Sequence, residues 1–233
     1  KPVFFFFFKA TMTDINGETH DMETIVSIGY QSIFLEILTP ADNEISTFKK
    51  VNISAKNFSR KEQDVNARFI MSPIQSPAIA KRERYWEAPD LFIYTKSEYE
   101  NYFPYDEYKN ENDYHTWPVS TPVVDTTIST IDSAGIPINH TILKQGWYVL
   151  EAITIDKNGD SIFDKKYVLL NDKSKIEIPV PQYEYFSVIK ASVQPGKTAS
   201  IVVGSSEKNV FLIQSIYHNT KENVIADYQF LQI

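Results

Sequence analysis

The chain has 233 residues, with 30 acidic against 23 basic side chains and no cysteine. The net charge of -7 excludes a protein that binds nucleic acid through its phosphates, because that function needs a basic face. The missing cysteine excludes disulfides, thiolate metal sites and thiol nucleophiles. An aromatic content of 14% with many Ile, Val and Thr favours strands, so we expect an all-β chain long enough for about two small domains.

The first predicted element is a strand over residues 3–12. It contains the run Phe4 to Phe8, which is far shorter than the roughly 20 apolar residues of a membrane helix. We therefore interpret the run as a buried strand. Asn16-Gly17 follows and predicts a two-residue type I′ hairpin turn with positive φ at both residues, after which a second strand covers 25–28.

An internal repeat indicates the domain organisation. Leu150-Glu151-Ala152 precedes Asn158-Gly159 in the same register as Phe8-Lys9-Ala10 precedes Asn16-Gly17. We interpret both segments as the last two strands of successive sandwich modules. The predicted domains are therefore 1–31, the terminal strands of a preceding module; 32–172, one complete module; and 173–233, the start of a following module.

The predicted complete module contains more chain than one sandwich of about 100 residues needs. Strands are expected at 32–38, 50–55, 65–72 and 123–130, before the closing hairpin at 147–155 and 167–170. The surplus, at about 73–122, is interpreted as a mostly irregular, ordered insertion with eleven aromatic residues between Tyr85 and Trp117. Ser97 and Glu100 match a capping box and Pro104 ends the pattern, which predicts one short helix near 97–103.

Five further strands are expected in the last part of the chain, at 176–180, 186–193, 198–203, 210–217 and 224–232. Turns are predicted at Pro195-Gly196 and at 205–209. These strands could form an incomplete sandwich, or could pair with residues 1–31 to complete one. Either arrangement would cover sheet edges that are otherwise open.

Aromatic side chains of the insertion are the candidates for contact with a partner protein or a glycan, because Tyr and Trp rings anchor partners and stack on sugars. The candidates are Tyr85, Trp86, Tyr94, Tyr105, Tyr108 and Trp117. The favoured alternative is that these rings form the small core that a long insertion needs. Lys81, Arg82 and Arg84 are expected to make surface ion pairs with the nearby acidic residues, worth at most about 1 kcal/mol each.

We expect no catalytic residue, no cofactor and no metal site. Asp156, Asn158 and Asp160 alternate as in a calcium loop, but no glycine stands at the sixth position, so a turn is favoured. The four histidines lack metal-ligand spacing. No Gly-x-Ser-x-Gly motif occurs, and the adjacent acids Asp106 and Glu107 favour solvated charge over a glycosidase pair.

Short residue strings with a characteristic order and spacing are spread over most of the chain. They are residues 10–19 with 26–30, Arg84-Tyr85-Trp86-Glu87-Ala88-Pro89-Asp90 with Phe103-Pro104 and Tyr108, Gly146-Trp147-Tyr148 with 156–159, and Pro195-Gly196 with 203–206. Together they resemble the bacterial alpha-2-macroglobulin family. The resemblance implies serial macroglobulin domains, which are seven-stranded antiparallel sandwiches of the immunoglobulin and fibronectin type.

The same resemblance implies an endopeptidase inhibitor that traps proteases in the periplasm or on the cell envelope, with any membrane anchor outside this chain. In that family, cleavage of a bait segment triggers enclosure of the protease, in many members with a thioester between Cys and Gln. This chain has no cysteine and hence no such thioester. We identify no bait segment, and so carry no functional residue over from the family.

The function expected from the sequence is a non-catalytic scaffold segment of such a protein. Its implied partners are the neighbouring macroglobulin domains and, through the whole protein, proteases. The alternative is a surface glycan- or protein-binding module that uses the aromatic insertion. A third hypothesis, an accessory module of a secreted hydrolase, has the least support because the sequence supplies no nucleophile, base or metal site.

Overall fold

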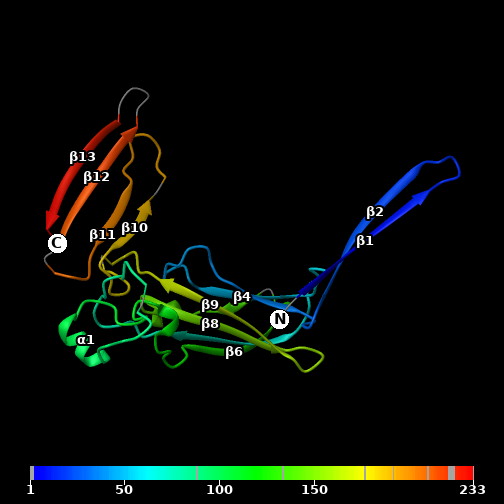
Figure 1. Cartoon of the computed structure of the whole chain (residues 1–233), viewed down its shortest axis with the longest axis horizontal. Helices are drawn as coiled ribbons and strands as arrows, with labels where there is room; N and C mark the ends of the chain where they lie inside the picture. The colour runs from blue at the N-terminus through cyan, green and yellow to red at the C-terminus, as the bar shows by residue number, and fades with distance from the viewer. Residues whose placement is uncertain are drawn as a thin grey trace. The chain divides into compact units, whose positions relative to one another are not determined.

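The computed structural model describes residues 3–87, 89–132, 134–175, 177–190, 192–208, 210–219 and 224–232. The chain forms two compact units. Unit 1 comprises Lys1–Pro73, Thr121–Leu143 and Tyr148–Val168, and unit 2 comprises Ile74–Ser120, Lys144–Trp147 and Leu169–Ile233. The sheets of both units are antiparallel, and the described residues contain one α-helix (Figure 1). The predicted all-β class is confirmed.

Unit 1 contains three antiparallel sheets. Its strands, of which the last two extend into unit 2, are β1 (Val3–Thr13), β2 (Thr19–Gly29), β3 (Phe34–Leu38), β4 (Lys50–Lys56), β5 (Asn66–Pro73), β6 (Val124–Ser129), β7 (Ile136–Pro137), β8 (Gly146–Ile155) and β9 (Ser161–Leu170). The sheet orders are β1-β2, β3-β4-β7 and β6-β5-β8-β9. A 3₁₀ turn, η2, covers His140–Ile142. The four strands predicted between 32 and 130 and the closing hairpin are confirmed to within a few residues.

The core of unit 1 is built by alternation along these strands. Side chains point to opposite faces at successive strand positions, so every second residue can be buried. In β4 the buried positions are Val51, Ile53 and Ala55, and in β5 they are Ala67, Phe69 and Met71. The three-stranded and four-stranded sheets each bury one such apolar face, which accounts for most of the core.

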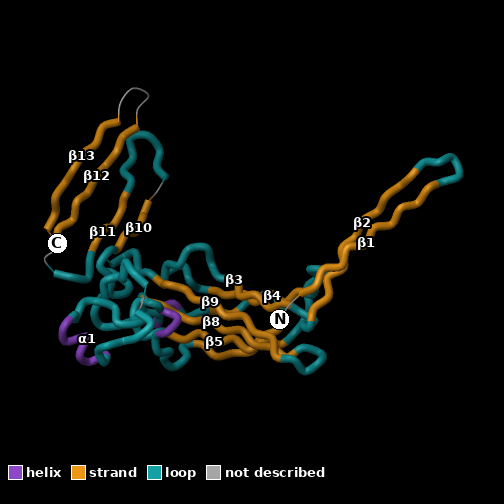
Figure 2. The backbone as a smooth tube through the Cα atoms, in the orientation of Figure 1, coloured by secondary structure: helices purple, strands orange, loops and turns teal. Residues whose placement is uncertain are grey.

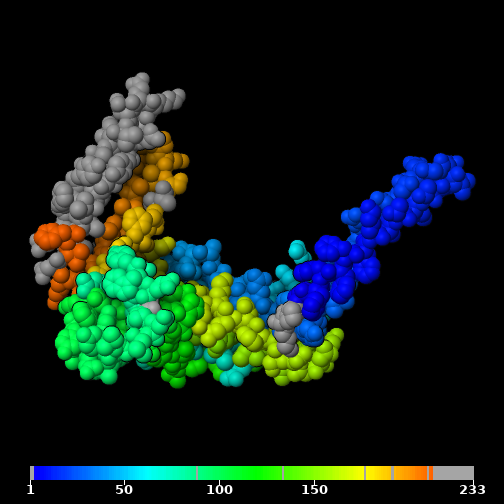
Figure 3. Space-filling model, viewed as in Figure 1, coloured from blue at the N-terminus to red at the C-terminus, as the bar shows by residue number. Residues whose placement is uncertain are grey.

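The hairpin of β1 and β2 is the exception, because both of its faces are exposed. The prediction of a strand at Phe4 to Phe8 is confirmed, but the prediction that it is buried is wrong: Phe7 is 78% exposed and Phe8 is 56% exposed. Among the described strands, β1 pairs with β2 alone. In the space-filling view the hairpin is a narrow, extended segment, coloured blue (Figure 3). Apolarity predicted the strand, but burial also requires a covering layer.

The two Asn-Gly hairpins have the same loop, which differs from the prediction. The Asp14 carboxylate accepts the N–H groups of Asn16 and Glu18 at 2.9 and 2.8 Å. Asp156 does the same for Asn158 and Asp160, at 2.8 and 2.9 Å. Only the glycine of each loop has positive φ, 84° in both cases. The loops are therefore type I turns followed by a left-handed glycine; the predicted type I′ turn is wrong, because the aspartate side chain stabilises the alternative.

A third loop repeats this pattern with arginine in place of glycine. The Asn57 N–H donates to the Lys61 carbonyl, the Lys61 N–H donates to the Asn57 side chain, and Arg60 has a φ of 58°. A left-handed conformation costs a non-glycine residue about 1–2 kcal/mol. We therefore expect Arg60→Gly to raise the free energy of unfolding by about 1 kcal/mol in urea titrations.

The matched control for Arg60→Gly is Gly159→Ala, because an added Cβ at Gly159 would meet no atom within 4 Å. We expect Gly159→Ala to lower the free energy of unfolding by about 1 kcal/mol, and this decrease would then measure backbone strain alone. If Arg60→Gly is neutral or destabilising while Gly159→Ala behaves as expected, contacts of the arginine side chain outweigh its backbone strain.

Unit 2 contains the insertion and the last strands of the chain. Its elements are α1 (Lys96–Tyr102), η1 (Tyr114–Thr116), β10 (Tyr185–Lys190), β11 (Ser200–Gly204), β12 (Phe211–Asn219) and β13 (Val224–Gln232). Strands β10 and β11 form one two-stranded sheet, and β12 and β13 form another. The Lys197 N–H donates to the Gln194 carbonyl and Gly196 has a φ of 79°, as in a type II turn.

The last four predicted strands are confirmed, but the strand predicted at 176–180 is not. Residues 177–180 form no strand, and Ile176 lies outside the described residues. Pro179 and Pro181 have no N–H to donate to a neighbouring strand, so an apolar run interrupted by them does not form a ladder. The proposed turn at 205–209 contains bends over 206–208, while Asn209 lies outside the described residues.

Candidate functional site

The insertion, defined here as residues 74–120, is an irregular segment between β5 and β6 with short helices (Figure 2). Its two ends are tied together. Ile74 forms an antiparallel bridge with Val119, and the Gln75 N–H donates to the Pro118 carbonyl at 2.9 Å. Ile74 also donates its N–H to the Trp147 carbonyl at 2.8 Å. The first and last residues of the insertion therefore lie side by side.

Helix α1 is present, but its capping box lies two residues before the predicted one. Thr95 is the N-cap: its side chain accepts the Glu98 N–H at 3.3 Å, and the Glu98 carboxylate accepts the Thr95 N–H at 2.8 Å. The predicted box of Ser97 and Glu100 is wrong. Both pairs match the Ser/Thr-x-x-Glu pattern. Tyr99 in the helix and the C-cap Phe103 are four residues apart, and their rings are 5.1 Å apart.

Thr95→Ala is expected to destabilise α1 by about 1 kcal/mol, and Ser97→Ala is expected to have little effect. Hydrogen exchange of the Tyr99 and Phe103 amides, which donate to the Thr95 and Tyr99 carbonyls, measures this. The expected acceleration is about fivefold for Thr95→Ala. Equal effects of the two substitutions would contradict the observed box.

The same capping box predicts a pH dependence. Hydrogen bonds from the Thr95 side chain and backbone lower the pKa of Glu98 below its ordinary value of 4.5. A carboxyl whose pKa is lowered by folding contributes its stabilisation fully above the unfolded value. That contribution is lost as the pH falls through the lowered pKa. The exchange difference between the native chain and Glu98→Gln should therefore shrink at acidic pH, after correction for intrinsic exchange rates.

Several rings of the insertion form a small core. Tyr108 is buried, its ring lies 4.6 Å from Phe92 and 5.3 Å from Tyr99, and its hydroxyl donates to the Tyr94 carbonyl at 2.8 Å. Tyr94 in turn lies 5.6 Å from Tyr102. A buried tyrosine with a bonded hydroxyl is a packing residue. The expectation that Tyr108 is an exposed contact residue is therefore wrong, and the packing interpretation holds for this part of the insertion.

A stacked pair joins the insertion to strand β8. The rings of Tyr114 and Trp147 are 3.8 Å apart and 9° from parallel. Trp117 is also fixed, because its indole N–H donates to the Glu111 carbonyl at 2.7 Å. Asp113 caps the intervening 3₁₀ turn by accepting the His115 N–H at 3.0 Å. The segment from Asp113 to Trp117 is thus held by both stacking and hydrogen bonds.

The three basic residues at the start of the insertion bind mainly to backbone carbonyls. Arg82 pairs with Asp106 at 2.6 Å, as expected. Lys81 donates to the Pro104 carbonyl at 2.7 Å, and Arg84 donates to the carbonyls of Glu107 and Tyr108. The ion pairs expected for Lys81 and Arg84 are not observed among the described residues. These two side chains instead fasten segment 81–84 to segment 104–108.

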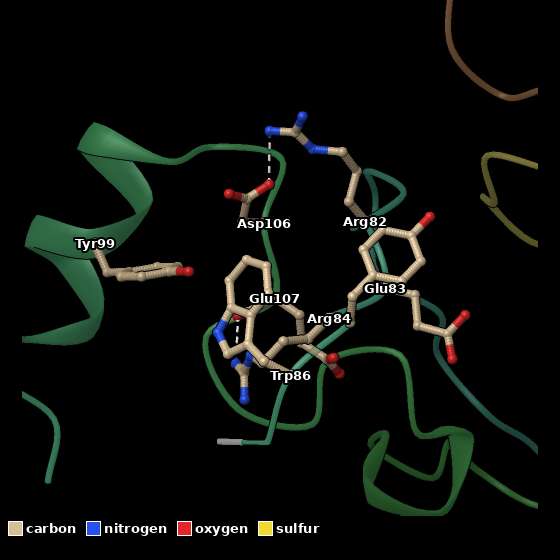
Figure 4. A pocket seen from close by; sticks show the side chains of 8 residues that line it. Arg82, Glu83, Arg84, Trp86, Tyr99, Asp106 and Glu107 are labelled. Atoms are coloured by element: carbon tan, nitrogen blue, oxygen red, sulfur yellow. Dashed lines mark hydrogen bonds and ion pairs between the residues drawn. The ribbon is translucent and has the colours of Figure 1, made fainter. Parts of the chain in front are cut away.

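A small hollow of about 190 Å³ lies beside this junction (Figure 4). Tyr99 projects into it from α1, Trp86 lies across from Tyr99, and Arg82 reaches Asp106 at its edge. Trp86 is 68% exposed, which leaves much of its ring accessible. Segment 82–86, helix α1 and segment 106–107 therefore line one concave surface.

A larger hollow of about 580 Å³ shares Arg82, Glu83 and Tyr85 with the small one. Three segments that are distant in sequence line it. The insertion contributes Tyr85, Tyr114 and Trp117, strand β8 contributes Trp147, and the segment 180–184 contributes Tyr183. Burial first, and then the charge of Glu207, raise the pKa of the Tyr183 hydroxyl. A tyrosine hydroxyl is protonated in neutral solution even at its ordinary pKa, so Tyr183 can donate a hydrogen bond.

The six predicted contact residues are thus in different environments. Tyr85 and Trp86 are exposed at the hollows, Tyr94 and Tyr105 are about half exposed, and Trp117 is partly buried but lines the large hollow. The large hollow also contains Tyr114, Trp147 and Tyr183, which sequence reasoning did not select as contact residues. Tyr114 was present in the aromatic run, but no local pattern links that run to Trp147 or Tyr183.

The described residues contain no cluster of three or more His, Asp or Glu side chains able to hold a metal ion. The Asp156 carboxylate accepts two loop N–H groups and the Ser32 hydroxyl at 2.9 Å. Burial opposes its ionisation, but these hydrogen bonds outweigh that effect and lower the pKa of Asp156. Asp156 is therefore occupied in stabilising the turn.

No helix in the described part of the chain is both long and apolar enough to cross a bilayer. No protein-family model, curated protein or solved structure matches the chain.

Proposed function

We propose that the chain is a non-catalytic scaffold segment of a protein built from serial β-sandwich modules, and that this protein is a protease-trapping envelope protein of the alpha-2-macroglobulin type. The proposed domains are 1–31, 32–172 with its insertion, and 173–233. The observation that carries the proposal is the hairpin β1–β2, which has the features of a module's closing hairpin but lacks a covering sheet.

The inward face of this hairpin corresponds to the buried face of β8–β9. Phe8, Val26 and Ile28 are 56%, 42% and 53% exposed. Their counterparts in the repeat are Leu150, Val168 and Leu170, which are all buried. Phe4 pairs with Ile28 and Phe6 pairs with Val26, so these apolar side chains share one face of the hairpin. We infer that a preceding module covers this face.

The outward faces also correspond. Lys9 lies opposite Glu23 in β1–β2, with their charged atoms 3.5 Å apart. At the corresponding positions Glu151 and Lys165 form a pair at 3.2 Å, with the charges exchanged. In β1–β2 this face is mixed, because Phe7 lies on it beside the ion pair. The two hairpins thus share their loop, the apolar residues of one face and a cross-strand ion pair on the other.

The strand order supports a sandwich of the immunoglobulin and fibronectin type. The chain places β3 and β4 in one sheet, β5 and β6 in the other, β7 in the first again, and β8 and β9 in the second. Such alternation between two antiparallel sheets is typical of Greek-key sandwiches. We propose that the neighbouring modules are the direct partners of this segment and that proteases interact through the whole protein.

The experiment that tests trapping uses a longer polypeptide containing this chain. It is incubated with trypsin, chymotrypsin and elastase, and cleavage of a small chromogenic peptide is compared with cleavage of casein. Trapping predicts that the peptide is still cleaved while casein is protected, because only large substrates are excluded from an enclosed protease. Equal cleavage of both substrates would show that the protein does not trap proteases.

A further inference from the structure

The large hollow of unit 2 has a ligand-binding composition that a scaffold role does not require. Five aromatic rings line it, together with the polar side chains of Lys81, Arg82, Glu83, Asn112, Gln182 and Glu184. From this lining we propose that the hollow binds a neutral oligosaccharide. This binding is independent of the scaffold function, since it needs only unit 2 and no neighbouring module.

The dimensions of the hollow suit a ligand of a few sugar rings. Its volume of about 580 Å³ lies within the range of roughly 300–1,000 Å³ that is usual for small-molecule sites. The lining comes from the insertion, from β8 and from the segment 180–184. Convergence of three such segments provides a concave surface that could contact a ligand from several sides.

The rings provide apolar surface that is already fixed in place. Trp147 is held by its stack with Tyr114, and Trp117 is held by its bond to the Glu111 carbonyl. Fixed side chains lose little conformational entropy when a ligand binds. Tyr85 is 95% exposed, so its ring can close over a ligand. The C–H faces of sugar rings pack against aromatic rings of this kind.

The charges of the hollow favour a neutral ligand. Arg82 is paired with Asp106, and Lys81 donates to the Pro104 carbonyl, so both cations have partners. The lining also contains the carboxylates of Glu83 and Glu184, so it has no excess of positive charge. A phosphate or sulfate would therefore meet two carboxylates without a net positive charge to attract it.

The polar side chains also favour a hydroxyl-rich ligand over a proline-rich peptide. Aromatic grooves can bind polyproline helices, but proline has no N–H. Such a peptide would leave the acceptors of Glu83 and Glu184 without donors. The side-chain amide of Gln182, which lines the hollow, can both donate and accept. Sugar hydroxyls also donate and accept, and can satisfy all three side chains.

Calorimetric titration of the 233-residue chain tests this proposal with cellohexaose, xylohexaose, mannohexaose and maltohexaose, and with a decaproline peptide. We expect at least one of the hexasaccharides to bind and decaproline not to bind. Gln182→Ala should weaken sugar binding roughly fivefold, as for one lost hydrogen bond, and Tyr85→Ala about tenfold. Tyr30→Ala, which removes a tyrosine 65% exposed in unit 1, is the matched control and should have no effect.

Trp86→Ala separates the two hollows, because Trp86 lines only the small one and Gln182 lines only the large one. Sugar binding that depends on Gln182 and not on Trp86 supports the proposal. The proposal is overturned if none of the four hexasaccharides binds at millimolar concentration, or if decaproline binds in their place. It is also overturned if sugar binding is lost in Trp86→Ala but unchanged in Gln182→Ala.

Discussion

Replacing Leu150 by Ala is expected to lower the free energy of unfolding by about 2–5 kcal/mol, whereas replacing Phe8 by Ala should change it by less than about 0.5 kcal/mol. The two residues hold corresponding positions in hairpins β8–β9 and β1–β2. Leu150 is fully buried, however, and Phe8 is 56% exposed. The removal of a side chain costs stability in proportion to the contacts that it makes. Urea unfolding of the 233-residue chain, followed by circular dichroism, measures both effects.

The same substitution tests the serial arrangement when it is made in a longer polypeptide that carries a preceding module. There Phe8 is expected to be buried, and Phe8→Ala should cost about 3–5 kcal/mol. Lys9→Ala is the control, because Lys9 lies on the opposite face in exposed ion pairs with Asp21 and Glu23 and should have a small effect in either polypeptide. If Phe8→Ala stays neutral in the longer protein, the hairpin does not close a preceding module.

The strands and hairpins were predictable because their signals are local. Alternation of apolar residues reflects the two-residue period of a strand, and Asn-Gly indicates a tight turn. Burial is not local, since it depends on residues elsewhere that cover the strand. The run Phe4 to Phe8 therefore has the composition of a core strand while its side chains are exposed. Both faces of the hairpin carry phenylalanine, and only the comparison with β8–β9 indicates which face corresponds to a buried one.

Two other features were predicted in kind but not in detail. A glycine with positive φ serves both the type I′ turn and the observed loop, and the hydrogen bonds of Asp14 and Asp156 decide between them. Thr95 and Ser97 both precede a glutamate by three residues. In the structure Thr95 makes the reciprocal hydrogen bonds with Glu98. In both cases one short pattern is compatible with two local structures.

The candidate site was predictable only in part. The aromatic run identified Tyr85, Trp86 and Trp117 as candidates, and each of them lines a hollow. Trp147 follows Trp117 by 30 residues, and its position in the sequence shows only that it is part of a β-strand. Its stack on Tyr114 depends on the path of the whole insertion. Tertiary contacts of this kind have no signature in a single sequence.

Trp147→Ala is expected to destabilise the segment from Asp113 to Trp117 by about 2 kcal/mol, because it removes the ring that covers Tyr114. The Thr116 and Trp117 amides, which donate to the Asp113 and Tyr114 carbonyls, should then exchange about 30-fold faster. Trp147→Phe keeps an aromatic ring and should recover most of the protection. The α1 amides provide an internal reference, because their capping hydrogen bonds do not involve Trp147.

A double-mutant cycle with Tyr114→Ala isolates the stack from other effects of the substitutions. We expect a coupling free energy of about 0.5–1.5 kcal/mol between the two rings. If the coupling is absent, or if exchange in the segment is unchanged in Trp147→Ala, hydrogen bonds alone hold this part of the insertion. With the coupling, the ring that fixes the insertion to β8 also forms a wall of the large hollow. The stack of Tyr114 on Trp147 would then determine the shape of the large hollow as well as order the insertion. Sugar binding would be expected to slow hydrogen exchange of the Thr116 and Trp117 amides.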